Sequence, residues 1–221
     1  MSTTIHQTKS YLYLPDSNIK IIPPIGLRKS SMDRRDVSLD SMQEQDFLLA
    51  FEQRVKAAVL QPVGELDGDF MLTDDLLQQW ERLQADYVAE AVHLVVEYPE
   101  VSVAWAAYLG LAIAQGWDMN WDMIQGTSLK DFYGEQGFDD MDDNILQNHL
   151  GLQLNSPEAQ YYVNRFQACA RMATTCLRRE EIPPQSPLAY HCFVLVCKLM
   201  FSLGASLRLK HLGYALKRVD I

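Results

Sequence analysis

The sequence lacks the short motifs that identify the common enzyme classes. It contains no G-x-S-x-G nucleophile elbow, no Walker A loop, no G-x-G-x-x-G dinucleotide fingerprint and no H-E-x-x-H zinc motif. No stretch carries a motif that places the chain in a named family. Enzymes without short motifs exist, so these absences make catalysis less expected but do not exclude it. We therefore expect a non-catalytic chain that needs no cofactor.

Cysteine is also scarce, and its pattern excludes two kinds of site. The four cysteines form no C-x-x-C pair, and no histidine stands at zinc-finger spacing. All four lie in apolar helical patterns, so we expect free, buried thiols at Cys169, Cys176, Cys192 and Cys197. The N-terminus lacks the basic and apolar regions of a secretory signal. Reduced thiols without such a signal favour a cytoplasmic location.

Long apolar runs that could cross a bilayer are few. Residues 101–117 carry no charge but reach only 17 residues, the short limit for a span. Residues 188–207 are longer, but they include His191 and Lys198. A lysine near the bilayer centre costs roughly 2.5–3.5 kcal/mol on insertion scales. We therefore expect no membrane span and no membrane partner.

Positive charge is concentrated at the N-terminus. The chain of 221 residues has a net charge of −10. Residues 1–36 hold six basic and three acidic side chains, a net charge of +3, which leaves −13 for the remainder. An acidic body disfavours nucleic acids and anionic membranes as partners, since binding to either requires their negative charge to be neutralised. The opposite signs favour docking of the N-terminal segment on its own body or on another copy.

The N-terminal segment has the pattern of a β-hairpin. Two β-prone runs, at 11–14 and 19–22, flank four turn formers at 15–18. A basic linker follows as far as residue 36. An isolated hairpin is marginal in water, so this arm needs a surface to pack on. We expect it to bind a protein partner or another copy of the chain through four apolar residues: Tyr11, Tyr13, Ile19 and Ile21.

Helical periodicity covers nearly everything after residue 37. Between Val101 and Trp117 only Ser102 and Gln115 are polar, and a helix that is apolar all round must be buried on every side. The sequence therefore predicts an all-α bundle of about six or seven helices around a central apolar helix, with an N-terminal β-hairpin arm. Residues 1–36 form the arm and linker, and residues 37–221 form the helical domain.

Caps, prolines and glycines set the expected helix boundaries. Ser or Thr at an N-cap, Pro at the first helical position and Pro or Gly after the last turn are the signals used. Gly116 is expected to interrupt the central helix. The expected segments begin and end at about 38–61, 73–98, 99–125, 139–152, 156–180 and 186–218.

One helix carries a partial metal motif. Glu90-x-x-His93, with Glu97 four residues later, would lie on one side of the helix that follows Thr73. Di-metal carboxylate bundles need this motif on two helices and a Glu from each of two others, and here only one copy exists. A metal-dependent helical enzyme is the alternative interpretation. The simpler interpretation places these residues on a solvated helix face, and we expect no bound metal.

The run from Asp140 to Asn144 imitates the start of an EF-hand loop. The loop's glycine position is Ile145, and its bidentate glutamate position is Gly151, so the calcium motif fails. We expect these acidic residues to cap the helix that follows them.

Two further features allow a structural and a functional interpretation. Trp117-Asp118 and Trp121-Asp122 are four residues apart, which predicts neighbouring stripes of indoles and carboxylates. They could form a pocket for a cationic group or simply the amphipathic end of the central helix.

The last helix ends with five basic residues, which suit the helix dipole or an acidic partner: Arg208, Lys210, His211, Lys217 and Arg218.

Overall fold

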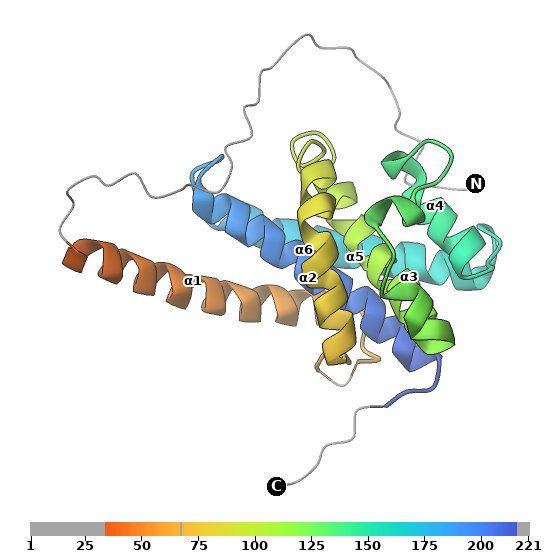
Figure 1. Ribbon diagram of the computed structural model, residues 1–221. Helices are drawn as coiled ribbons and strands as arrows, with labels where there is room; N and C mark the ends of the chain where they lie inside the picture. The colour runs from red at the N-terminus through yellow and green to blue at the C-terminus, as the bar shows by residue number, and fades with distance from the viewer. Residues whose placement is uncertain (1–33, 67, 216–221) are drawn as a thin grey trace, which may run out of the picture. The chain divides into compact units, whose positions relative to one another are not determined.

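The computed structural model describes residues 34–66 and 68–215, and the part it describes is helical without β-strands (Figure 1). This confirms the all-α prediction. The predicted hairpin, with Tyr11, Tyr13, Ile19 and Ile21, lies outside the described residues. The chain divides into two units, residues 1–47 and residues 48–221. The helices are α1 (Arg34–Leu60), α2 (Asp74–Ala91), α3 (Pro99–Ile124), α4 (Met141–Asn144), α5 (Pro157–Arg179) and α6 (Pro187–His211).

The central helix is α3, as predicted. Every residue from 102 to 114 is buried, and the helix packs chiefly against α6 and then against α5. Two glycines allow the close approach of α3 and α6. A Cβ atom on Gly204 would lie 1.8 Å from the carbonyl oxygen of Ala107, and one on Gly110 would lie 2.0 Å from that of Phe201. The two most apolar helices therefore meet backbone to backbone at these positions.

Helix α6 is long and apolar enough to cross a bilayer by length and composition. In the structure, 78% of its most apolar window is buried. Ser202 and Ser206 within it donate hydrogen bonds to carbonyl oxygens of their own helix, Lys198 at 2.8 Å and Ser202 at 2.6 Å. The core helix of a folded domain has this same combination of length, apolar composition and burial.

Serine–proline pairs begin α5 and α6 as expected. Ser156 accepts a hydrogen bond from the backbone N–H of Ala159 at 3.2 Å, and Ser186 accepts one from Ala189 at 3.1 Å. Each pair places proline where its missing N–H has no helical partner to lose. Helix α5 ends at Arg179, one residue before the predicted position.

Several expected boundaries were wrong. Helix α1 begins at Arg34, four residues before the predicted start at residue 38 and within the predicted linker. Helix α2 ends at Ala91 rather than near residue 98, and residues 92–97 form turns. Three of those six residues are the β-branched Val92, Val95 and Val96, which lower helix propensity. Residues 138–149 form not one helix but a 3₁₀ turn, the short α4 and a π-helical turn.

Helix α6 ends at His211, short of the predicted residue 218. The N–H of Tyr214 donates to the carbonyl of Leu209, and that of Gly213 donates to Lys210, both at 3.0 Å. Gly213 has φ of +94°, so these two bonds form a Schellman motif. The glycine that permits this ending was visible in the sequence.

The break in α3 lies at Asn120 and not at Gly116. Asn120 has an extended backbone (φ −165°, ψ 94°), whereas Gly116 is helical. After this break the chain turns so that Ile124 packs against Gly116, where a Cβ atom would lie 2.6 Å from Cδ1 of Ile124. Gly116 therefore provides room for a side chain and does not weaken the helix.

Candidate functional site

The partial metal motif does not assemble. Helix α2 ends at Ala91, so His93 and Glu97 lie in the turns beyond it and not on a helix face shared with Glu90. The carboxylate of Glu90 accepts a hydrogen bond from the hydroxyl of Tyr133 at 3.1 Å. Across residues 34–66 and 68–215, no group of three histidine, cysteine, aspartate or glutamate side chains is placed to hold a metal ion.

The acidic run from Asp140 to Asn144 is used locally. Asp140 stands at the N-cap position of α4, and its carboxylate accepts the N–H of Gln136 at 2.9 Å. The side-chain amide of Asn144 donates to the carbonyl of Phe132 at 3.0 Å. The run therefore joins the start of α4 to the loop before it. The burial of Asp142, which is 3% exposed, was not expected from the sequence.

Three of the four cysteines are buried, as predicted. Cys169, Cys192 and Cys197 are fully buried, and none of the four cysteines forms a disulfide. Cys176 is half-buried. Burial raises the pKa of the Cys169 thiol to about 12, with a smaller opposing effect of Arg165. None of the three buried thiols has the polar, accessible setting that a reactive cysteine needs.

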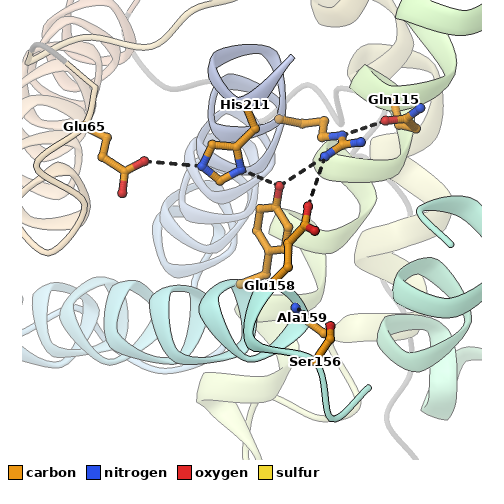
Figure 2. Close-up of polar contacts among 8 residues, drawn as sticks. Glu65, Gln115, Ser156, Glu158, Ala159 and His211 are labelled. Carbon is orange, nitrogen blue, oxygen red and sulfur yellow. Dashed lines mark hydrogen bonds and ion pairs between the residues drawn. The ribbon is translucent and has the colours of Figure 1, made fainter. Parts of the chain in front are cut away.

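A polar cluster joins the end of α6 to α5 and to the loop after α1 (Figure 2). The hydroxyl of Tyr162 lies 2.6 Å from Nδ1 of His211. On its other side His211 faces Glu65, with 3.4 Å between Nε2 and Oε2. Glu65 also accepts the hydroxyl hydrogen of Tyr161 at 2.6 Å. The order Glu65, His211, Tyr162 resembles a carboxylate, a base and a hydroxyl in series.

Arg208 completes this cluster from within α6. Its Nε donates to Oε1 of Gln115 at 2.6 Å, and its terminal nitrogen lies 3.4 Å from the Tyr162 hydroxyl and 3.9 Å from Glu158. Only 14% of the Arg208 side chain is exposed. Arg208 therefore points into the fold, whereas His211 is exposed but contacts Tyr162 and Glu65. Both already have partners within the chain, which does not favour the interpretation of the basic helix end as a docking patch for an acidic partner. Their spacing of three residues, which places them on one helix face, was the sequence signal for this arrangement.

The burial and hydrogen bonding of the cluster indicate a structural role in joining the helices. Tyr162 is fully buried. Burial raises the pKa of Tyr162, and its hydrogen bond from Arg208 opposes this only in part. Burial likewise raises the pKa of Tyr161, and its bond to Glu65 adds to the effect. A hydroxyl nucleophile must be accessible to a substrate and activated by a neighbouring base or by a lowered pKa. Tyr162 has His211 beside it but is fully buried, so in this structure the cluster joins α5, α6 and the loop at Glu65.

The Trp117 and Trp121 pair is separated by the break at Asn120. Trp117 turns inward, where its Nε1 donates to the carboxylate of Asp75 at 3.2 Å and its ring meets Tyr214 at 5.7 Å. The hydroxyl of Tyr214 donates to Asp118 at 2.7 Å. Tyr214 therefore lies beside both Trp117 and Asp118, where the functional interpretation would place a cationic group.

Negative charge is concentrated in the middle of the chain. Residues 72–149 hold 15 acidic and two basic side chains, a net charge of −13. Residues 150–221 hold four acidic and nine basic side chains, a net charge of +5. The acidic segment includes α2, α3 and α4. The acidic excess of the chain therefore lies in the segment that contains these helices and the turns between them.

Exposed apolar side chains occur in the same acidic segment. Met119 and Met123, at the end of α3, are 72% and 73% exposed, and Val96, in the turns after α2, is 87% exposed. Methionine adapts to irregular surfaces and is common at protein-binding sites. The end of α3 therefore combines exposed methionines with aspartates.

Comparisons with known proteins add no relative. No family model matches the chain, and neither the curated proteins nor the solved structures include a significant match.

Proposed function

We propose that the chain is a non-catalytic helical interaction or assembly subunit whose N-terminal arm docks on a partner protein or on another copy. The observation that carries this proposal is the division of charge. The arm and linker have a net charge of +3, whereas residues 72–149 have −13. Opposite charges on two surfaces accelerate their encounter and select against wrong partners. Nucleic acids and anionic membranes are poor partners for the acidic helices.

The polar groups of the described helices support this proposal over a catalytic one. The most connected set, around Tyr162 and His211, is taken up in joining helices. The metal-dependent alternative needs Glu90, His93 and Glu97 on one face, and α2 ends before the second of them. A cytoplasmic location remains a prediction from the sequence.

The experiment compares the full-length protein with a variant in which the four apolar arm residues are replaced by serine: Tyr11→Ser, Tyr13→Ser, Ile19→Ser and Ile21→Ser. Size-exclusion chromatography with light scattering gives the mass, and affinity capture from the source cell gives heterologous partners. We expect the wild-type protein to exceed its monomer mass of 25.2 kDa or to capture a defined partner. The variant should lose that assembly, and raised salt should weaken it in the wild type.

Circular dichroism of both proteins is the control, because the helical body should be unchanged. The proposal fails if mass and captured partners are the same for the two proteins. It also fails if the wild-type protein is a monomer without partners.

A further inference from the structure

The end of α3 carries exposed apolar side chains together with an exposed aspartate. We define the α3-end surface by Met119, Trp121, Asp122 and Met123. The two methionines are nearly three-quarters exposed, and Trp121 is half-buried. Single exposed apolar residues are ordinary on protein surfaces, but here three apolar side chains occur within five residues.

The charge of this region specifies the kind of segment that fits it. Helix α3 contains no lysine or arginine, and its second half carries Asp118 and Asp122. Asp118 is held by Tyr214, whereas Asp122 accepts one hydrogen bond, at 3.3 Å, from the exposed amide of Gln125. Asp122, which is exposed and directly precedes Met123, can therefore receive a cation. The complementary segment is basic and carries apolar side chains.

The chain itself contains such a segment. Residues 1–36 have a net charge of +3 and include the apolar run at 11–14 and the run at 19–22, which is apolar except for Lys20. We infer that the α3-end surface is the receptor for the N-terminal arm of a second copy of this chain. This inference rests on the proposed function and names its site: the apolar arm residues contact Met119, Trp121 and Met123, and a basic side chain of the arm pairs with Asp122.

The test is photo-crosslinking in the full-length protein. Met119 is replaced by the photoreactive benzoylphenylalanine, and copies grown in light and heavy nitrogen are mixed before irradiation. Mass spectrometry then identifies which residues are joined. The expected result is a covalent dimer in which position 119 of one isotope is linked to residues 1–36 of the other.

A matched position separates the α3-end surface from general apolar contact. Val96 lies in the same acidic segment and is 87% exposed. Benzoylphenylalanine at position 96 should give much less of the dimer linked to residues 1–36. Equal yields at the two positions would overturn the inference. So would links at position 119 only within one isotope, which would show that the arm docks on its own copy.

A second measurement uses substitution and no crosslinker. The double variant Met123→Ser with Asp122→Asn should weaken self-association at least about tenfold in analytical ultracentrifugation, whereas Val96→Ser should leave it unchanged. If the four-serine arm variant dissociates the assembly but the α3-end variant does not, the proposed function stands and the inference about its site is wrong. If the wild-type protein does not self-associate, the inference fails, and captured partners alone decide the proposed function.

Discussion

Trp105 shows how single aromatic residues hold the middle of the molecule. It is 3% exposed, and its ring meets Phe138 edge-on with 4.9 Å between centroids. Tyr108, three residues later, is fully buried and meets Phe166 at 4.8 Å. Both were predicted as core residues, and both predictions are confirmed. The indole N–H of Trp105 has no hydrogen-bond partner among the residues that the structure describes.

Trp105→Ala should lower the free energy of unfolding by about 3–5 kcal/mol, because truncation of a large buried aromatic leaves a cavity. Trp105→Phe should cost clearly less. It keeps a ring against Phe138 and removes a buried N–H that has no described partner. Urea titration followed by circular dichroism measures both. A loss from Trp105→Ala no larger than that from Trp105→Phe would show that this site is not a packed core position.

Prediction from the sequence was correct for residues in a run that is apolar throughout. It failed for residues whose partners are far away along the chain. The uncharged run around Trp105 allows only a buried helix, so its place followed from the pattern. Arg208 and His211 look like a solvated basic terminus until α5 and the loop at Glu65 are placed beside them. Their partners Tyr162, Glu65 and Gln115 are 46 to 146 residues away along the chain. No local pattern specifies such pairs.

The α3–α6 pair depends on its two glycines. Gly110 and Gly204 lie where each helix touches the backbone of the other, and no side chain fits between them. Close backbone contact lets the flanking apolar side chains interlock at high density. These positions therefore fix the distance between the two most buried helices.

Gly204→Ala should destabilise the protein although alanine favours a helix over glycine by about 1 kcal/mol. The new Cβ would overlap the carbonyl of Ala107, so the helices must move apart, and overpacking of this kind costs about 1–3 kcal/mol or more. Gly126→Ala is the matched control, since its Cβ would meet nothing closer than the Met123 carbonyl at 3.9 Å. Thermal unfolding of the two variants should separate them. Equal midpoints would refute the close-contact explanation.

The starts of α5 and α6 were predicted correctly, whereas the start of α1 and the ends of α2 and α6 were not. Ser156 and Ser186 each precede a proline, and their caps depend on residues three positions away. The end of α2 was placed too late, although the valines among residues 92–97 lower helix propensity. The break at Asn120 accompanies the packing of Ile124 against Gly116. Local signals therefore fixed where α5 and α6 begin, and packing within the fold accompanies the end of the straight part of α3.

At the scale of the whole molecule, buried phenol and thiol groups make the free energy of unfolding depend on pH in the alkaline range. Burial raises the pKa values of Tyr87 and Tyr108 well above the ordinary value near 10. At Tyr108 the nearby charges of Asp142 and Asp143 add to this effect. Burial, with a contribution from Glu90, raises the pKa of Tyr133 to about 12. The Cys169 thiol, whose ordinary value is near 9, is raised to about 12.

The sign of the effect follows from these directions. Below about pH 9 the folded and unfolded chains both keep these protons. Above it the unfolded chain releases them first, because its pKa values are the lower ones, and the folded chain keeps them. Ionisation then favours the unfolded state. The free energy of unfolding should therefore fall steadily from about pH 9 to pH 12, whereas Asp and Glu, already ionised, contribute no change there.

Tyr108→Phe tests this coupling at one group. Its hydroxyl has no hydrogen-bond partner within the described part of the chain, so its removal should cost little stability at pH 7 and keep the ring against Phe166. Each such group contributes a slope of up to about 1.4 kcal/mol per pH unit above its unfolded pKa. The variant should therefore lose stability less steeply than the wild type between pH 10 and pH 12, by up to that amount. Urea titrations at fixed pH values give both slopes. Parallel curves would mean that Tyr108 ionises as readily in the folded chain as in the unfolded one, and that its burial is not maintained in solution.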